Sequence, residues 1–142
     1  EIPEFGRSLG LELLEPTHVY AGEVMTLLRT VTVHAMSHIT GGGLANNLVR
    51  VVPDGMLVTV DRATWSPGPV FELVRSVGRI SREDIEETLN MGVGMVALLP
   101  ADQVDEARRV LDGLGLGNWV CGHVEARPGP AGVELVGGHP RA

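Results

Sequence analysis

The chain has 142 residues, 44% of them hydrophobic, and a formal net charge of −7. This length and hydrophobic content suit one domain with a core and are too small for two ordinary domains. The acidic balance argues against a general nucleic-acid binder, because no basic stripe is present to release counterions from phosphates. All 11 basic residues are arginines, which leaves no lysine for catalysis.

The first residues, Glu1-Ile2-Pro3-Glu4-Phe5, lack the pattern of a signal peptide, and no apolar run is long enough to cross a bilayer. We therefore expect a soluble, cytoplasmic protein. The single cysteine, Cys121, excludes an internal disulfide and a cysteine metal cluster. Its apolar neighbours favour a buried position in a strand over a nucleophile.

Hydrophobic spacing, punctuated by glycine and proline, predicts ten elements in chain order after a lead-in segment over residues 1–14. The first half reads as a helix over 18–30 capped by Thr17, a strand over 31–37, a helix from the triple glycine through Arg50, and a strand over 56–60 after the turn Pro53-Asp54-Gly55. The second half reads as a helix ending at Gly78, a helix opened by Ser81, a strand over 93–99, a helix capped by Asp102 that stops at Gly113, and strands over 118–125 and 133–136 around the hairpin loop 127–130.

The resulting order, α-β-α-β-α-α-β-α-β-β, predicts an α+β domain with three layers, α/β/α, around a mixed, largely antiparallel sheet. Residues 93–99 are apolar except for Gly94, a composition that suits a strand covered on both faces. We expect this strand to be central in the sheet.

The segment His38-Ile39-Thr40-Gly41-Gly42-Gly43-Leu44 carries the strongest functional signal. Glycines between a strand and a helix let backbone N–H groups approach a ligand closely, and a helix start favours an anion. Asn46 and Asn47 follow on the predicted helix and add polar groups. The lysine of a P-loop is missing and the glycines are contiguous, so neither a P-loop nor a Rossmann fingerprint is present.

A second motif, Asn90-Met91-Gly92-Val93-Gly94-Met95, lies between a predicted helix and the apolar strand. The two glycines have structural explanations, the end of a helix and close packing in a strand. Asn90 can equally be structural or bind a substrate amide or hydroxyl. We predict no metal site, because His34 and His38 lack a carboxylate in register. Trp65 and Trp119 are expected to serve packing.

Four motifs, in this order, resemble the C-terminal half of the phosphoribosylformylglycinamidine cyclo-ligase family, also called aminoimidazole ribonucleotide synthetase. They are Glu15-Pro16-Thr17, the segment 38–44 with Asn47, the segment 90–95, and Trp119-Val120-Cys121-Gly122. The resemblance implies an ATP-dependent ring closure in purine biosynthesis that converts formylglycinamidine ribonucleotide to aminoimidazole ribonucleotide and releases ADP and phosphate.

The resemblance also implies that residues 1–142 form the C-terminal domain of a longer enzyme, homodimeric when complete. Its amino-terminal domain would bind most of the ATP and Mg²⁺, so this chain alone is expected to be inactive. Gly41, Gly42, Gly43, Asn47 and Asn90 are the expected phosphate or substrate contacts. Thr40 and His38 are the expected catalytic residues, with His38 serving either proton transfer or phosphate binding.

Two positions depart from the family pattern. The chain has His18 where the family usually has arginine after Glu-Pro-Thr, and Leu89 where it commonly has phenylalanine. The alternative to the enzyme is a free-standing, noncatalytic module of the same fold that binds a phosphorylated metabolite or a protein partner.

Overall fold

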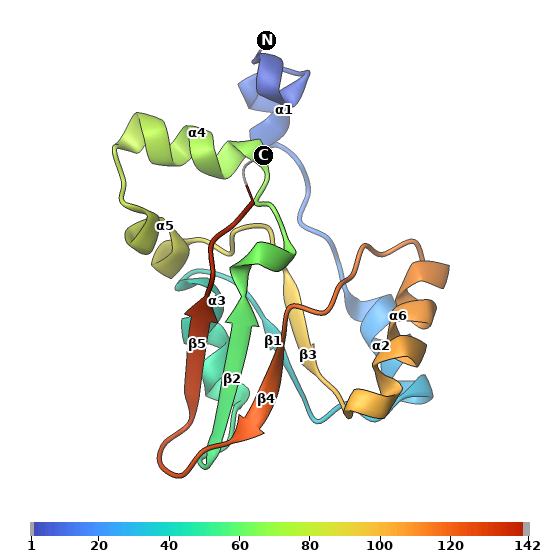
Figure 1. The fold of residues 1–142 in the computed structure, drawn as a ribbon. Helices are drawn as coiled ribbons and strands as arrows, with labels where there is room; N and C mark the ends of the chain where they lie inside the picture. Colours follow the sequence, from blue (N-terminus) through green and yellow to red (C-terminus); the bar gives the residue numbers. More distant parts are fainter. Residues whose placement is uncertain (1, 141–142) are drawn as a thin grey trace.

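The computed structural model describes residues 2–140 and has the α+β architecture that the sequence predicts (Figure 1). The helices are α1 (Leu9–Leu13), α2 (Ala21–Thr30), α3 (Gly43–Leu48), α4 (Pro69–Gly78), α5 (Arg82–Thr88) and α6 (Val104–Gly113). The strands are β1 (Ala35–His38), β2 (Met56–Asp61), β3 (Met95–Leu98), β4 (Gly122–Ala126) and β5 (Gly132–Val136). Short 3₁₀ turns occupy Pro3–Phe5, Val49–Val51, Arg62–Thr64 and Ala101–Gln103.

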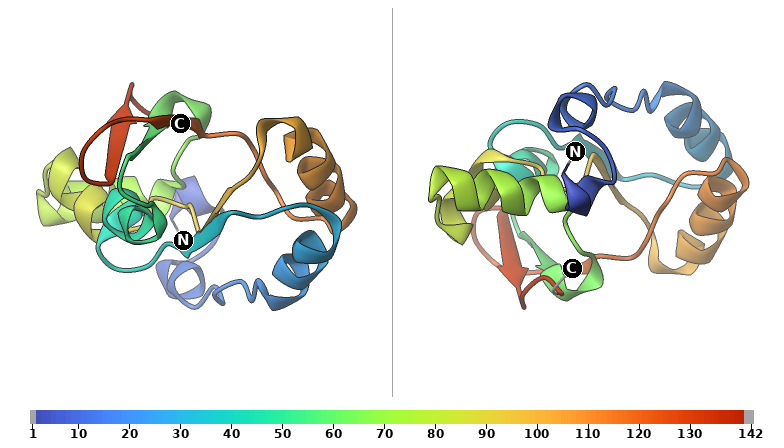
Figure 2. Two further views of the ribbon diagram at one scale, coloured as in Figure 1. Left: turned by 90° about the horizontal axis from the view of Figure 1, so that it is seen from below. Right: turned by 90° about the horizontal axis from the view of Figure 1, so that it is seen from above.

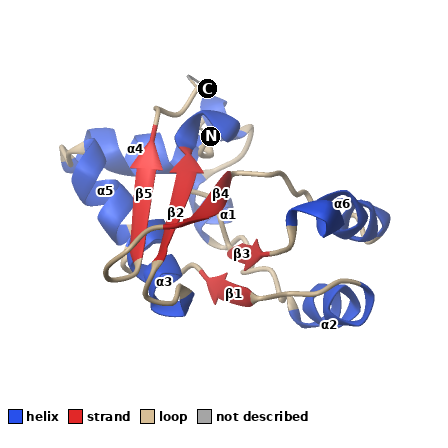
Figure 3. Ribbon diagram, turned by 60° about the horizontal axis from the view of Figure 1, so that its bottom comes forward, coloured by secondary structure: helices blue, strands red, loops and turns tan. Residues whose placement is uncertain are grey.

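The strands form two sheets in place of the single predicted sheet (Figure 3). β1 and β3 make an antiparallel pair. In the other sheet β2 lies in the middle, antiparallel to β4 and parallel to β5. The expectation that β3 is central is therefore wrong, and so is the hairpin, because β4 and β5 flank β2 and do not pair with each other.

The residues before β4 lie outside any strand. The predicted strand over 118–125 begins only at Gly122. The Asn118 side-chain amide donates to the Asp112 carboxylate at 2.7 Å and to the Leu116 carbonyl at 3.0 Å. These bonds hold Asn118 against the end of α6, and the chain reaches β2 at Cys121, whose carbonyl accepts from the Asp61 N–H at 2.7 Å.

Two hydrophobic clusters lie on opposite faces of β3, because alternate residues of a strand point to opposite sides. Val96 belongs to the larger cluster, which is formed mainly by α3, β2 and β5. Ala97 faces the smaller cluster, formed where α2 and α6 lie side by side (Figure 2). The prediction that this strand is covered on both faces is confirmed in part, because Val96 is buried while Met95, Ala97 and Leu98 are half-buried. The most deeply buried large side chains are Ile39, Leu48, Ile85 and Val60.

Helix starts follow local polar chemistry only in part. Ser81 caps α5 as predicted, accepting a hydrogen bond from the Asp84 N–H at 3.0 Å. Thr17 does not cap α2, because the chain enters the helix at Tyr20. Asp102 does not cap α6 either, because it lies inside the 3₁₀ turn that precedes the helix.

The lead-in segment contains the short helix α1, which the sequence analysis did not predict. Ser8 caps it, and Arg7 forms ion pairs with Glu12 at 2.7 Å and Glu15 at 2.6 Å. None of its residues is buried, which explains why the sequence shows no helical spacing of hydrophobic residues there. Within residues 2–140, no helix combines the length and apolar character needed to cross a membrane.

Replacing Gly43 with alanine is expected to destabilise the fold. Gly43 has a φ of +72°, and a Cβ at this position would overlap the backbone carbonyl oxygen of Glu86. Overpacking and left-handed strain together predict a loss of about 2–4 kcal/mol in the free energy of unfolding. Urea denaturation measures it, with Gly41→Ala as the matched control, because a Cβ on Gly41 meets no atom within 4 Å. Equal midpoints for the two variants would contradict the packing described here.

Candidate functional site

A cleft of about 470 Å³ lies where three segments of the chain meet, with Phe71 of α4 completing its lining. The first segment is the connection from Thr17 into α2. The second runs from His38, at the end of β1, into the glycine loop (residues 41–43). The third is the turn between α5 and β3, which carries Asn90. The cleft therefore gathers residues that are far apart in the sequence.

Four of the predicted site residues line this cleft together: His38, Thr40, Gly41 and Asn90. The other three, Gly42, Gly43 and Asn47, are not among its lining residues. Among the lining residues that the sequence analysis did not predict are Thr17, which was assigned a capping role, and His18 and Tyr20, which lie beside it. The Glu15-Pro16-Thr17 motif was the signal that could have found them.

The three glycines of the loop have different surroundings. Gly41 is exposed at the cleft. Gly42 has a φ of +96°, and its N–H donates to the Thr88 carbonyl at 3.2 Å. Gly43 is buried against the backbone of α5. Gly42 and Gly43 thus fix the loop to α5, and Gly41 is the glycine that a ligand in the cleft can reach.

Asn47 supports the glycine loop from behind. Its side chain is buried, and its amide nitrogen lies 2.7 Å from the Gly43 carbonyl, 3.2 Å from that of Gly41 and 3.4 Å from that of Thr40. Arg50 approaches the Asn47 amide oxygen at 3.5 Å. The Asn47 side chain is therefore bonded to the backbone of the loop and stabilises its conformation.

Asn90 stands in a tight turn that orients its side chain. Its amide oxygen accepts a hydrogen bond from the Gly92 N–H at 3.1 Å. Met91 and Gly92 both have positive φ, +50° and +88°. With the oxygen engaged inside the turn, the NH₂ group of Asn90 is the part that can donate to a ligand in the cleft. Gly92 serves this turn and does not end α5, which stops at Thr88.

Three aromatic rings follow one another along the cleft wall. Tyr20 lies edge to face with His18 at 4.7 Å and with His38 at 6.0 Å between ring centroids. His18 Nε2 lies 2.9 Å from the Glu23 carboxylate. Two hydrogen bonds lower the pKa of the Glu23 carboxyl. The larger effect comes from the backbone N–H of Glu23 itself, and the next from the side chain of His18.

Gly94, the residue before β3, makes room for Tyr20. A Cβ on Gly94 would overlap the Tyr20 hydroxyl. The adjacent Ile39 N–H donates to the Gly94 carbonyl at 2.9 Å, which continues the β1–β3 pairing up to the cleft. The expectation that Gly94 relieves close packing is confirmed.

The lining contains His18 and His38 and, within the described residues, no aspartate, glutamate or arginine. Across residues 2–140, no three His, Cys, Asp or Glu side chains gather in a way that could hold a metal ion. Threonine hydroxyls, an asparagine amide and imidazoles remain, and these suit a polar ligand held by hydrogen bonds.

A profile of the AIR synthase related proteins, C-terminal domain, matches residues 1–133. The chain belongs to this family. It is 58% identical over 127 residues to a putative phosphoribosylformylglycinamidine cyclo-ligase of Streptomyces fradiae, covering 89% of this chain and 70% of that protein. It is 41% identical to a phosphoribosylformylglycinamidine cyclo-ligase of an Anaeromyxobacter species and 38% identical to that of Geotalea daltonii, covering 92% and 95% of this chain. The chain spans only 38% and 39% of the length of those two relatives.

Three of the four family motifs meet at the cleft. Thr17, the loop after His38 and the turn at Asn90 all contribute to its lining. The fourth motif, residues 119–122, leads into β4, where Gly122 lets the backbone pack against the Thr59 carbonyl. Both departures from the family pattern, His18 and Leu89, also lie in the cleft wall.

Cys121, in the fourth motif, is a packing residue. It is partly buried and contacts the larger hydrophobic cluster. Burial raises the pKa of its thiol, which keeps it protonated and poorly nucleophilic near neutral pH. The expectation of a buried small hydrophobe agrees with these surroundings, although the residue precedes β4 and does not lie inside it.

Replacing Gly94 with alanine is expected to drive the Tyr20 ring from its place in the cleft, because the new methyl group occupies the position of the hydroxyl. Tyr20 is the only tyrosine, so its ring signals are unambiguous in an NMR spectrum. We expect the contacts between the Tyr20 and His38 rings to disappear in a chain that stays folded. Gly117→Ala is the control, since a Cβ there meets no atom within 4 Å. A Tyr20 ring that keeps its contacts in Gly94→Ala would refute this description of the cleft wall.

Proposed function

We propose that this chain forms one wall of the active site of a phosphoribosylformylglycinamidine cyclo-ligase. The reaction would convert formylglycinamidine ribonucleotide to aminoimidazole ribonucleotide with the conversion of ATP to ADP and phosphate. The observation that carries the proposal is the meeting of His38, Thr40, Gly41 and Asn90 in one cleft. The family membership and the names of the relatives support it.

The chemistry requires an anion to be held beside the reacting amide. ATP phosphorylates the amide oxygen of the substrate, a substrate nitrogen then attacks the same carbon, and the carbon–oxygen bond breaks as phosphate leaves. Donors placed in advance stabilise the charge that develops, and exclusion of water protects the phosphorylated amide. A cleft formed by hydroxyl, amide and imidazole groups meets the first of these needs.

Within this proposal the lining residues take separate tasks. Thr40 and the backbone of Gly41 bind phosphate, and the Asn90 NH₂ group donates to the substrate. His38 binds phosphate or transfers a proton. Gly42, Gly43 and Asn47 support the loop, since the contacts described for them above are with the chain itself.

Mg²⁺ does not fit the residues of this cleft, because its lining within the described chain lacks the carboxylates that this ion prefers. We therefore assign the binding of the metal and of most of the ATP to an amino-terminal domain of the same enzyme. The complete enzyme would be a cytoplasmic homodimer. By itself the chain is expected to have no ring-closing activity.

The variant Asn90→Asp tests the substrate contact. It keeps the oxygen that accepts from the Gly92 N–H, but it removes the NH₂ donor and adds a negative charge. In the complete gene product we expect kcat/KM to fall about 10- to 100-fold, as befits the loss of one polar contact. The measurement is the rate of aminoimidazole ribonucleotide formation.

The matched control is Gln103→Glu, which makes the same amide-to-carboxylate change at a residue that does not line the cleft and keeps the oxygen that accepts from the Thr32 N–H. Its rate should stay within about twofold of the unmodified protein. Equal rates for the two variants would remove Asn90 from the site. A complete gene product that binds phosphate but never closes the ring would instead support the noncatalytic module.

Inorganic phosphate and ribose 5-phosphate are expected to bind this chain at the cleft, because Thr40 and Gly41 present polar groups there. In an NMR titration we expect amide shifts at Thr40, Gly41 and Asn90. Larger shifts are expected at Gly41 than at Gly43, which is buried. Thr40→Val should weaken binding, while Thr26→Val on α2, outside the cleft, should not. Absence of shifts at millimolar phosphate would refute the loop assignment.

A further inference from the structure

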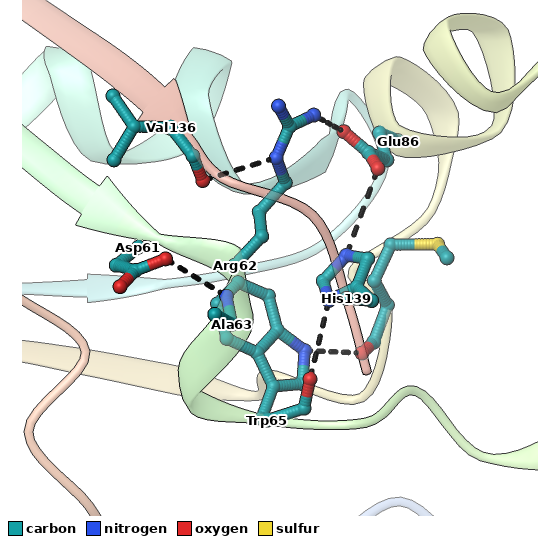
Figure 4. A network of polar contacts seen from close by, with 8 residues as sticks. Asp61, Arg62, Ala63, Trp65, Glu86, Val136 and His139 are labelled. Carbon is teal, nitrogen blue, oxygen red and sulfur yellow. Dashed lines mark hydrogen bonds and ion pairs between the residues drawn. The ribbon is translucent and has the colours of Figure 1, made fainter. Parts of the chain in front are cut away.

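A network of polar contacts joins the end of the described chain to the turn that carries Asn90 (Figure 4). Trp65, which follows the 3₁₀ turn Arg62–Thr64, is its central member. The indole Nε1–H of Trp65 donates to the Met91 carbonyl oxygen at 3.1 Å. Trp65 does not line the cleft, so this bond reaches the cleft only through the turn.

The turn that receives this bond needs external support. Met91 has a φ of +50°, a left-handed conformation that costs a residue with a side chain about 1–2 kcal/mol. The turn also positions Asn90, whose amide oxygen is bonded to the Gly92 N–H. A donor that fixes the Met91 carbonyl therefore restricts the orientation of Asn90 as well.

Trp65 is itself held from the opposite side by His139. The imidazole lies edge to face with the indole at 4.5 Å between centroids, and His139 Nδ1 is 3.3 Å from the Trp65 carbonyl oxygen. His139 Nε2 lies 3.6 Å from the Glu86 carboxylate. The side chains of His139 and Glu86 are only 7% and 13% exposed, so solvent screens this contact little.

Arg62 completes the network and links it to α5. It pairs with the Glu86 carboxylate at 2.8 Å, and its Nε donates to the Val136 carbonyl at 3.3 Å. The backbone of Glu86 is the surface against which Gly43 packs. The same residue of α5 thus contacts the network through its side chain and the glycine loop through its backbone.

We propose that Trp65 is a positioning residue for the cleft. Its indole N–H holds the left-handed Met91 turn and, through it, the Asn90 side chain, while His139 and the Arg62–Glu86 pair keep the indole in place. The effect on substrate rests on the function proposed above. The effect on the turn does not.

The variant Trp65→Phe separates this role from packing, because phenylalanine keeps an aromatic ring and loses the N–H donor. We expect a folded chain in which the Gly92 amide exchanges with solvent at least tenfold faster and the Asn90 side-chain NH₂ signals move. In the complete gene product we expect KM to rise several-fold with a smaller change in kcat, since Asn90 is assigned to binding. Trp119→Phe is the control: the Trp119 ring lies 6.2 Å from that of Trp65 between centroids, phenylalanine keeps a ring there, and the bond to Met91 comes from Trp65 alone.

A second change distinguishes positioning from general support. Glycine adopts a positive φ without strain, so Met91→Gly should partly restore the Asn90 signals and KM in the Trp65→Phe background. A purely structural role for the indole would not be rescued in this way. If Trp65→Phe does not fold, His139→Phe replaces it. That variant keeps a ring beside the indole, loses both polar contacts of the imidazole, and is expected to change the same signals to a smaller extent.

The outcomes separate the two proposals. Unchanged Gly92 exchange and Asn90 signals in Trp65→Phe would overturn the positioning role, whatever the activity. Altered signals with an unchanged KM in an active enzyme would overturn its connection to substrate binding. A complete gene product without ring-closing activity would defeat the proposed function, while the exchange and NH₂ measurements would still decide whether Trp65 holds the turn.

Discussion

The close contact between the glycine loop and α5 is the constraint on which the cleft depends. Gly43 has no side chain, so the loop backbone can touch the Glu86 carbonyl, and the neighbouring Gly42 N–H bonds to Thr88. This contact brings the segment after β1 next to the turn after α5. Together with the β1–β3 pairing, which the Ile39 N–H extends to Gly94, it lets Thr40 and Asn90 line the same cleft.

A second close approach, at Gly94, adds the third wall. The missing side chain leaves room for the Tyr20 ring, which stands between His18 and His38. Small residues therefore provide the space in the cleft, and polar residues beside them provide its chemistry. The buried side chains beneath, including Ile39 and Ile85, keep these backbones close together.

The sequence predicted the elements better than their partners. Helical spacing and the Ser81 cap are local signals, and α4 and α5 formed where those signals placed them. Strand pairing is not local, because a hydrophobic pattern states which faces are buried and not which strand lies alongside. For this reason β3 was wrongly expected to be central and β4 and β5 were wrongly expected to form a hairpin.

The candidate site was predictable to a similar degree. The order of the motifs along the sequence pointed to four residues that do share the cleft, namely His38, Thr40, Gly41 and Asn90. Asn47 was recognised as part of the motif, but a sequence does not show whether an asparagine faces a ligand or its own loop. Trp65 was expected only to pack. Its bond to Met91 joins residues 26 positions apart, and local sequence patterns do not reveal a contact over that separation.

The pairing of β1 with β3 gives the cleft one stiff side and one compliant side. His38 lies opposite Met95 in a hydrogen-bonded ladder, and the Ile39 N–H extends that ladder to Gly94. Residues 15–19 approach from the other side outside any helix or strand. A ligand would thus meet a fixed template on the sheet side, and the entropy cost of ordering would fall mostly on Thr17, because Glu23 and Tyr20 already hold His18. Affinity could then be tuned through the connection before α2 without disturbing the chemistry presented by the strands.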